Sequence, residues 1–348
     1  RAHATVTFEA AKPGLVLPEA APYTGRLHIR PIGIPAVVRR EHPASYQMIT
    51  KAIAGAFPEA APGWHKGTAG AILIVGGSEG LTGAPHLAAR AALRAGGGLI
   101  SVAAPHGLCR DIKADCPDIM TRALGPAGNV RWSPALLDEL LPFLRQCGAM
   151  ALGPGIGREP ETAAFVQALL MCPSRPSAVV DADALHALAM HPEALSSLRA
   201  CDVLTPHPGE AATLLHTTPA LVQADRFAAL AGLRRLAPSV WILKGAGTLI
   251  GTEGQPVTIA PYAEPNLAVG GSGDVLSGCL GTLMAQTAAH PSEGCESSSF
   301  LAACMGVQLH ARAGRLLREA FPQRGNSATD IAEMLPRARI REAAGDGA

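Results

Sequence analysis

Short apolar runs alternate with glycine-rich turns from about residue 66 to residue 260. The runs that we interpret as strands lie at 71–75, 99–103, 149–153, 178–181, 202–205, 240–245, 248–251 and 256–260. Most of them are apolar at nearly every position, which is typical of strands buried on both faces of a parallel sheet. Helical spacing lies between them, for example at 84–96. The pattern predicts an α/β fold with a mostly parallel central sheet flanked by helices on both faces.

The last part of the chain has the pattern of helices. We predict them at about 273–287, 298–320 and 327–336, the last with Ser327 or Thr329 as its N-cap. A further helix is predicted at 45–57, where the sequence reads SYQMITKAIAGAF.

Residues 1–40 differ from the rest. Two short strand-like runs, at 4–8 and 27–35, are separated by a Pro- and Gly-rich stretch, and the pattern shows no helix of useful length. A piece of this kind cannot form a core alone. A break near 36–42 therefore divides the chain into a small segment, 1–40, and a main body, 41–348.

Composition excludes several classes of protein. The net charge is +1, with no basic block, so neither nucleic-acid nor membrane-surface binding is predicted. None of the 8 cysteines forms a CxxC pair or a zinc-site spacing, which favours free thiols in a reduced, cytoplasmic setting. The longest apolar stretch, 267–289, contains Asp274 and many glycines, which argues against a membrane span.

The sequence GGSGDVLSG at 270–278 carries the clearest chemistry. Its glycines permit a tight turn, and the helix that follows presents its amide groups and positive dipole end to an anion such as a phosphoryl group. Asp274 would then lie beside a hydroxyl next to that phosphate and could take its proton. In the alternative interpretation, Asp274 only caps the helix.

Polar residues follow three other predicted strands. Because ligands bind beyond the carboxyl ends of strands in open α/β sheets, we expect these residues near one site. KGAGT at 244–248 offers Lys244, one of only 5 lysines, and Thr248 to a nucleotide. Either residue could instead be a solvated surface group.

The other two turns offer a histidine and several carboxylates. PHPGE at 206–210 places His207 near a polar ligand and Glu210 in the first turn of a helix. DADAL at 181–185 places Asp181 and Asp183 at a strand end, where paired carboxylates suit Mg²⁺ or a hydroxylated substrate. Structural roles, as caps or paired side chains, stay open for all four.

The turn GGSEGLTGA at 76–84 is glycine-rich but matches neither the dinucleotide fingerprint nor the P-loop. We therefore exclude a standard Rossmann or Walker site.

Six segments in order resemble one family. They are GGSEGLTGAPHLAARAALRAGGGLISVAAP, ALGPGIG, VVDADAL, LTPHPGE, ILKGAGT and GGSGDVLSG. Together they resemble the ribokinase-like NAD(P)H-hydrate dehydratases over about residues 45–340. Residues 1–40 resemble the tail of the NAD(P)H-hydrate epimerase domain that precedes the dehydratase in bifunctional bacterial enzymes. The resemblance implies an epimerase remnant at 1–40, without epimerase activity, and a dehydratase domain at 41–348.

The resemblance also implies a reaction, a carbon–oxygen lyase step. The C6 hydroxyl of the S-form of NAD(P)H-hydrate is phosphorylated by ADP in bacterial members or ATP in eukaryotic ones, and phosphate then leaves. Mg²⁺ would bridge the phosphates with few protein ligands. Family members are commonly homo-oligomers, often tetramers.

The resemblance assigns roles to individual residues. Asp274 would be the base, in a catalytic segment with Gly271, Ser272 and Gly273. The nucleotide would contact Lys244, Gly245, Ala246, Gly247, Thr248 and Gly273. The hydrated dinucleotide would contact Ala84, Gly155, Gly157, His207 and Asp274. Asp181, Asp183 and Glu210 would give polar support or face Mg²⁺, with no direct metal ligand assigned.

One stretch departs from the family pattern. Where the family has N-P-G-M-A-T, this chain has EPNLAV at 264–269. The carboxylate of Glu264 would repel phosphate unless it faces a metal or solvent. Two alternatives stay open: a small-alcohol kinase of the same fold, acting on a hydroxymethylpyrimidine or thiazole precursor, and a non-catalytic nucleotide-binding module.

Overall fold

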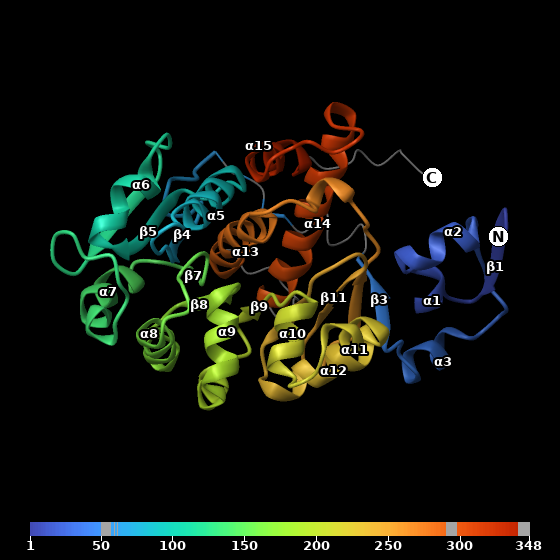
Figure 1. Cartoon of the computed structure of the whole chain (residues 1–348). Helices are drawn as coiled ribbons and strands as arrows, with labels where there is room; N and C mark the ends of the chain where they lie inside the picture. Colours follow the sequence, from blue (N-terminus) through green and yellow to red (C-terminus); the bar gives the residue numbers. More distant parts are fainter. Residues whose placement is uncertain (50–56, 59, 61, 290–297, 340–348) are drawn as a thin grey trace.

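A ten-stranded sheet forms the centre of the computed structural model, which describes residues 1–49, 57–58, 60, 62–289 and 298–339 (Figure 1). In spatial order the strands are β3 (Tyr46–Met48), β12 (Val257–Ala260), β11 (Thr248–Gly251), β10 (Val240–Leu243), β9 (Val203–Leu204), β8 (Ser177–Val180), β7 (Ala149–Leu152), β4 (Ala71–Val75), β5 (Leu99–Pro105) and β6 (Met120–Leu124). Only β11 runs antiparallel to its two neighbours, and the other pairs are parallel. The mostly parallel sheet that the sequence predicts is therefore confirmed.

The strand order reverses between β4 and β7. From β4 the chain builds outward through β5 to β6, and it then returns to place β7 on the other side of β4. Such a reversal opens a crevice beyond the carboxyl ends of the strands, where ligands bind in this class of fold. The glycine-rich turns 76–84 and 153–157 both lie at this point.

Helices cover both faces of the sheet (Figure 1). One face carries α5 (Gly83–Arg94), α6 (Cys109–Lys113), α13 (Ser272–Ala289), α14 (Ser298–Ala320) and α15 (Ala328–Ala338). The other carries α7 (Leu137–Leu144), α8 (Pro160–Met171), α9 (Asp183–Met190), α10 (Pro208–Leu214), α11 (Pro219–Ala224) and α12 (Arg226–Leu236). Short 3₁₀ helices occur at η1 (Pro18–Ala20), η2 (His106–Leu108), η3 (Pro134–Leu136), η4 (Pro192–Ser197) and η5 (Pro265–Leu267).

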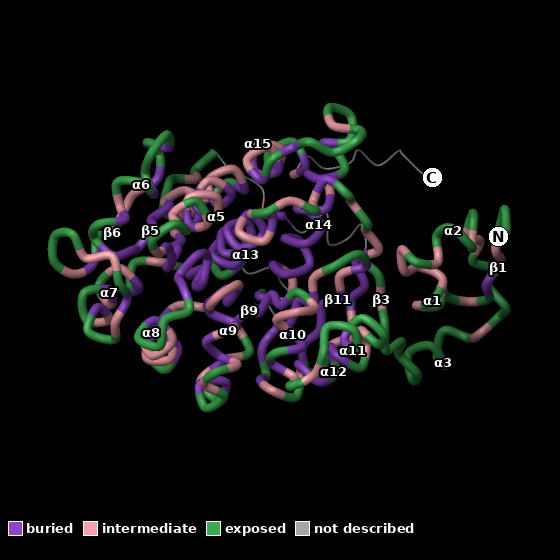
Figure 2. Tube along the Cα trace, viewed as in Figure 1, coloured by how far each residue is buried: buried purple, intermediate pink, exposed green. Residues whose placement is uncertain are grey.

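Two separate cores explain the apolar runs. Successive side chains of a strand point to opposite faces, so Ile72 and Ile74 enter one core while Leu73 and Val75 enter the other. Both positions of the alternation are thus buried, as the sheet and helix α13 in Figure 2 show. Helix α13 packs so closely on α5 that a Cβ at Gly278 would lie 1.8 Å from the carbonyl oxygen of Ala88.

The N-terminal segment forms a small unit beside the sheet. It contains β1 (Ala4–Phe8), α1 (Pro13–Val16), α2 (Ala21–Thr24), β2 (Arg26–Arg30) and α3 (Ala36–Glu41). Strands β1 and β2 pair in parallel, separately from the main sheet. Most of this segment is exposed, in contrast to the main body (Figure 2).

Most predicted elements are confirmed, and two predictions are wrong in part. The helix expected at 45–57 is wrong at its start, because Tyr46, Gln47 and Met48 form strand β3 and pair with β12 at the sheet edge. Residues 50–56 lie outside the described part of the chain. The strand expected at 27–35 ends at Arg30, as β2. The division of the chain near 36–42 stays a prediction, and the short helix α3 lies at this place.

Within the described residues, no helix is both long enough and apolar enough to cross a bilayer.

Candidate active site

The turn after β8 aims two carboxylates in different directions. Ala182 has a φ of +51°, a strained conformation for a residue with a Cβ. On one side of it Asp181 points toward Lys244, and on the other Asp183 points toward Gly157. Strain at this single residue therefore separates the two acids that the sequence places together.

A buried ion pair links β8, β10 and α13. The ammonium of Lys244 donates to Oδ1 of Asp181 at 2.7 Å, and the hydroxyl of Ser277 donates to Oδ2 at 2.5 Å. The Asp181 side chain is only 2% exposed. Burial acts to raise the pKa of Asp181, but Lys244 and the two hydrogen bonds outweigh burial and lower it. Asp181 therefore stays ionised, opposite a charged Lys244.

Asp274 lies in the first turn of α13, close to this pair. Burial, followed by repulsion from Asp181, raises its pKa to about 7, against a smaller opposing effect of Lys244. A Cβ built on the preceding Gly273 would lie 3.6 Å from the Lys244 nitrogen and 3.7 Å from Oδ2 of Asp181. A carboxyl group with a pKa near the working pH can both accept and release a proton.

Glu210 is the fourth charged group of the cluster. Its Oε2 lies 3.7 Å from the Lys244 nitrogen and accepts from the backbone amide of His207. Burial first, and then Asp181, raise the pKa of Glu210 to about 7, although Lys244 opposes this. One lysine thus faces three carboxylates, and the charge of Glu210 also contributes to the raised pKa of Asp274.

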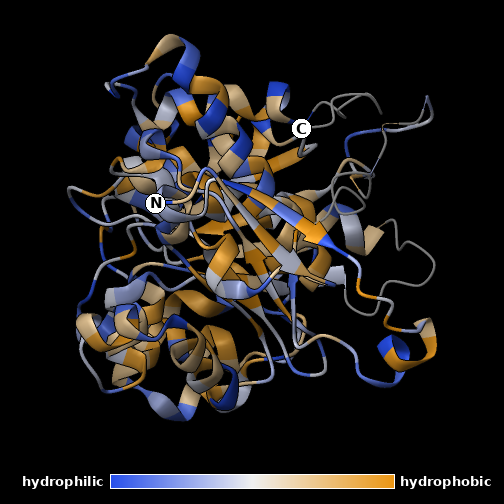
Figure 3. Cartoon of the chain, turned by 90° about the vertical axis from the view of Figure 1, so that its right-hand side faces the viewer, coloured by the Kyte–Doolittle hydropathy of each residue, from blue (hydrophilic) through white to orange (hydrophobic). Residues whose placement is uncertain are grey.

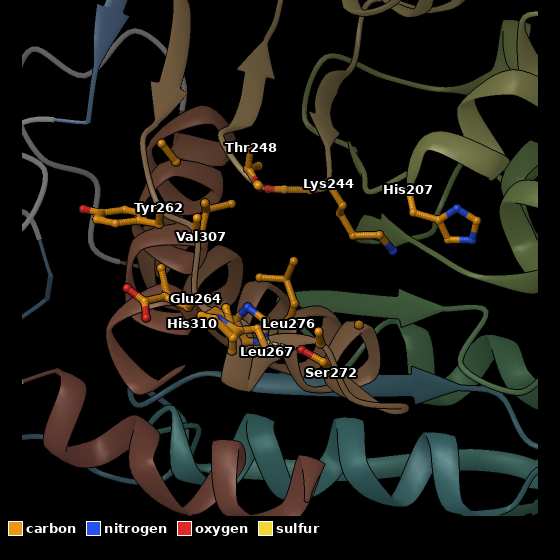
Figure 4. A pocket seen from close by; sticks show the side chains of 18 of the residues that line it. His207, Lys244, Thr248, Tyr262, Glu264, Leu267, Ser272, Leu276, Val307 and His310 are labelled. Atoms are coloured by element: carbon orange, nitrogen blue, oxygen red, sulfur yellow. Dashed lines mark hydrogen bonds between the residues drawn. The ribbon is translucent and has the colours of Figure 1, made fainter. Parts of the chain in front are cut away.

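A cavity of about 790 Å³ opens beside the cluster. In Figure 4 Lys244 and His207 lie toward one end and Tyr262 and Glu264 toward the other. The lining residues include the loop after β10, the η5 loop and the start of α13: Lys244, Gly245, Ala246, Thr248, Pro265, Leu267, Gly270, Ser272 and Gly273. This volume is in the range that small-molecule and cofactor sites occupy.

Arg226, at the start of α12, holds the loop after β10 in place. Its guanidinium donates to the carbonyl oxygens of Leu243 (3.2 Å), Lys244 (3.3 Å) and Gly247 (3.3 Å). A Cβ at Gly245 would lie 2.6 Å from Nη1 of this guanidinium. Glycine at 245 is therefore needed for close approach of the arginine.

A neutral histidine, His310, lines the cavity beside the start of α13. Nε2 of His310, from α14, lies 3.1 Å from the hydroxyl of Ser272. Burial lowers the pKa of His310 to about 4, so the ring is uncharged at neutral pH. His310 thereby fixes the first residue of α13 without adding charge.

Glu264 lines the cavity, and its carboxylate is paired with an arginine. Its Oε2 lies 2.9 Å from Nε of Arg318 on α14, and its side chain is 8% exposed. Arg318 and Arg324 also donate to the carbonyl oxygens of Ala263 and Ala268. Arg318 is therefore a partner that counters the expected repulsion.

A second cluster forms at the reversal of strand order. A Cβ at Gly155 would lie 3.0 Å from the Cβ of Ala84, and Ser78 donates to the Gly155 carbonyl at 2.9 Å. The amide of Gly157 donates to Asp183 at 3.2 Å, and Asp183 also pairs with Arg158 at 2.7 Å. None of these residues lines the 790 Å³ cavity.

His207 is tied into its own turn. Its Nδ1 accepts from the amides of Gly209 and Glu210, which caps α10, and its Nε2 lies 3.3 Å from Oε1 of Glu210. It nevertheless lines the cavity. The capping role that the sequence left open is thus present, together with a position facing ligand space.

The structure therefore gathers the predicted residues into two adjoining groups. Asp181, Lys244, Glu210 and Asp274 form one charged cluster, and Ala84, Gly155, Gly157 and Asp183 lie at the strand reversal. Sequence reasoning missed Arg226, His310, Ser277 and Arg318. Only Ser277 had a signal, one helical turn beyond Asp274 in the GGSGDVLSG segment.

Among the described residues, no three His, Cys, Asp or Glu side chains converge to hold a metal ion. Asp181, Asp183 and Glu210 instead have oxygens engaged by protein donors.

A mostly parallel α/β sheet with this charged cluster and glycine-rich helix start defines a ribokinase-like enzyme. A ribokinase-like protein from Enterococcus faecalis has the same fold, with a TM-score of 0.71, 20% identity and coverage of 85% of this chain and 95% of that one. An ADP/ATP-dependent NAD(P)H-hydrate dehydratase from Bacillus subtilis, co-crystallised with ATP and Mg²⁺, matches with a TM-score of 0.65, 22% identity and coverage of 84% and 96%.

Sequence comparison identifies the family. Residues 72–337 match the family model for NAD(P)H-hydrate dehydratase, and the chain belongs to this family. It is 41% identical over 335 residues to a bifunctional NAD(P)H-hydrate repair enzyme from Moorella thermoacetica. The aligned region covers 95% of this chain but only 61% of that relative. The chain thus spans about three-fifths of its relative's length. Membership of this family favours a dehydratase, which is a lyase, over a small-alcohol kinase.

Proposed function

We propose that this chain dehydrates the S-form of NAD(P)H-hydrate, with ADP or ATP as phosphoryl donor. The observation that carries the proposal is Asp274, a carboxyl with a pKa of about 7 at the start of α13, beside Lys244 and the cavity. A base of this strength beside a glycine-rich helix start suits the transfer of a phosphoryl group to a hydroxyl.

The reaction balances in two steps. In the first, Asp274 takes the proton of the C6 hydroxyl as its oxygen bonds to the terminal phosphorus of the donor. The bond from that phosphorus to the donor breaks, releasing AMP from ADP or ADP from ATP. In the second, the C6–O bond breaks, orthophosphate leaves, a proton leaves C5 and the C5=C6 double bond re-forms. Phosphate is a far better leaving group than hydroxide.

The nucleotide would occupy the cavity between the loop after β10 and the η5 loop. Lys244, Gly245, Ala246, Gly247 and Thr248 would hold its phosphates and sugar. Amide groups at Gly271 and Gly273 would stabilise the charge of the transferring phosphoryl group, because the first turn of a helix offers N–H donors. The Ser272 amide between them donates to the Val269 carbonyl at 3.2 Å and would have to exchange that bond to join them.

The hydrated dinucleotide would lie at the reversal of strand order. Ala84, Gly155 and Gly157 lie there, and Gly155 packs so closely on Ala84 that a Cβ at Gly155 would lie 3.0 Å from the Ala84 Cβ. His207 and Asp274 would contact its nicotinamide end. The C6 hydroxyl would then lie between this reversal and the nucleotide cavity.

Mg²⁺ fits this site as an ion brought in with the nucleotide. When bound, it would bridge phosphate oxygens and neutralise their charge, needing few protein ligands. A homo-oligomer, often a tetramer in this family, is a further part of the proposal and can be tested by sedimentation.

The direct test is recovery of NADH absorbance from prepared NADH-hydrate. The wild-type chain is given Mg²⁺ with ADP, with ATP or with no nucleotide, and AMP and orthophosphate are quantified. We expect nucleotide-dependent recovery with one orthophosphate released per NADH. Absence of recovery with either nucleotide, while small alcohols are phosphorylated, would contradict the proposal.

A further inference from the structure

One short stretch of the N-terminal segment packs against the main body. In a segment that is otherwise mostly exposed, Leu15, Val16, Leu17 and Pro18 are all half-buried. Val16 and Leu17 pack against the core on the α12 side of the sheet. By contrast Val6, Phe8, Ile29 and Val37 of the same segment are 46–57% exposed. Thr7 in β1 is buried as well, at 6% exposed, but Val16 and Leu17 are the residues of this segment that pack on a core of the main body.

This stretch touches the loop that lines the cavity. A Cβ built on Gly247 would lie 2.8 Å from Cδ of Pro18 and 3.1 Å from Cδ2 of Leu17. Gly247 has a φ of +66°, and its amide donates to the Tyr262 carbonyl at 3.0 Å. Leu17 and Pro18 therefore cover Gly247 on the side away from the cavity. The neighbours of Gly247 in the chain, Ala246 and Thr248, line the cavity.

The same stretch brings a carboxylate toward the arginine that holds the loop. Burial lowers the pKa of Arg226, and the nearby carboxylate of Glu19 opposes this effect. Arg226 donates to Lys244 and Gly247, so a charge that favours the guanidinium also favours these hydrogen bonds. Glu19 is itself exposed.

A second attachment lies on the same helix. Tyr46, in β3, stacks edge-on against Phe227 with ring centroids 5.1 Å apart, and Phe227 directly follows Arg226 in α12. Strand β3 also pairs with β12. The chain that follows the N-terminal segment is thus also attached to α12, and the N-terminus lies in front of the main body when that side faces the viewer (Figure 3).

We infer that Val16–Glu19 forms the outer wall of the nucleotide loop and positions it for binding. These are positioning residues, because they act through Gly247 and Arg226 rather than on a ligand. The inference rests on the proposed function for its nucleotide, but the contact itself does not. Because coupling is reciprocal, a nucleotide bound inside the loop should also order Val16–Glu19 outside it.

The test uses Leu17→Asp and the milder Leu17→Ala in the full chain. Val37→Asp is the matched control, since Val37 is 48% exposed on α3 of the same segment. The first readout is amide hydrogen exchange at 244–248 without nucleotide. We expect faster exchange in both Leu17 variants, led by the Gly247 amide, and no change in Val37→Asp.

The second readout separates positioning from general destabilisation. We expect the KM for ADP or ATP to rise about fivefold in Leu17→Asp, while the KM for NAD(P)H-hydrate changes less than about twofold. Added nucleotide should also slow exchange at 15–19 in the wild type. Unchanged exchange at 244–248 in both Leu17 variants, or equal rises in the two KM values, would overturn the inference.

The two failures can be told apart. If the wild type binds no adenine nucleotide, the proposed function fails, while exchange at 244–248 still decides whether the wall supports the loop. If nucleotide binds normally and is indifferent to Leu17, the positioning role alone fails. If Leu17→Asp does not fold, Leu17→Ala carries both readouts.

Discussion

The ammonium of Lys244 lies 2.7 Å from Asp181, and this ion pair joins the ends of β10 and β8. Ser277 completes the arrangement from α13 by donating to the second oxygen of Asp181. The other two acids near this lysine, Asp274 and Glu210, have pKa values raised to about 7, chiefly by burial and further by repulsion from Asp181, against the opposing effect of Lys244. The pair therefore contributes to the protonation of the proposed base.

Asp181→Asn should change both stability and pH dependence. Loss of the partner leaves Lys244 without its main counter-charge, which should lower the free energy of unfolding by about 2 to 3 kcal/mol, since Lys244 is partly exposed. Loss of a neighbouring negative charge should also move the acidic limb of the kcat/KM profile to lower pH. Denaturant unfolding and a pH series measure the two effects.

Asp138→Asn, at an exposed position of α7, serves as the control and should change neither quantity. An unchanged acidic limb in Asp181→Asn would show that Asp181 does not set the titration of the base.

Activity should rise with pH through about 7. Asp274 must be ionised to act as a base, and its pKa is about 7, as is that of Glu210. Because both groups have pKa values of about 7, the profile contains the titration of both. Measurement of kcat/KM from acidic to alkaline pH tests this, and a profile that is flat between about pH 5 and pH 9 would contradict it.

Asp274→Asn should remove activity and, at the same time, raise the free energy of unfolding. The pKa of Asp274 is raised from 3.8 to about 7, so the folded state binds more protons than the unfolded state between these values. The free energy of unfolding of the wild type therefore falls as pH rises from 3.8 to about 7. The variant has no carboxyl group at this position, so its stability does not fall for this reason. We expect an advantage on the order of 2 kcal/mol at about pH 8, shrinking toward pH 4.

Thermal unfolding of both proteins at several pH values measures this gap. A variant less stable than the wild type at alkaline pH would show that the Asp274 carboxylate is not strained by its surroundings.

Arg318→Ala should weaken nucleotide binding through Glu264. Removal of the arginine leaves a mostly buried carboxylate unpaired beside the cavity, which should raise the nucleotide KM about tenfold. The double variant with Glu264→Gln should recover most of the loss, since the charge to be neutralised is gone. A double variant that is as impaired as Arg318→Ala would disprove this coupling.

Two glycines of α13 should respond differently to alanine. A Cβ at Gly278 meets the backbone carbonyl of Ala88 at 1.8 Å, whereas one at Gly281 meets the end of the Ile72 side chain at 2.1 Å. A side-chain end can rotate away and a backbone carbonyl cannot. We expect Gly278→Ala to cost about 3 kcal/mol or more and Gly281→Ala clearly less, as measured by denaturant unfolding.

The sequence predicted what depends on local pattern. The runs at 71–75 and 240–243 are apolar on both faces, and the structure buries them in two cores. The helix expected at 45–57 was wrong at its start, because pairing of Tyr46–Met48 with the β12 edge overrides local helix preference. Strand β6, at the other edge, was missed because its residues are mostly half-buried rather than uniformly apolar.

The site shows the same division. Each contiguous motif, such as the one around Asp274, could be found in the sequence. The contacts His310–Ser272, Arg318–Glu264 and Arg226–Gly247 could not, because the residues are 21 to 54 positions apart and carry no motif. Only the packing of α14 and α12 against the loops brings them together.

The central claim is that Asp274 is the base of a nucleotide-driven dehydration. The most direct measurement compares wild type and Asp274→Asn for single-turnover recovery of NADH from NADH-hydrate, with the affinity for ADP and ATP measured on the same samples. We predict that recovery is lost by at least about a hundredfold while nucleotide affinity stays within about threefold. Near-normal recovery by a variant that binds nucleotide normally would contradict the account.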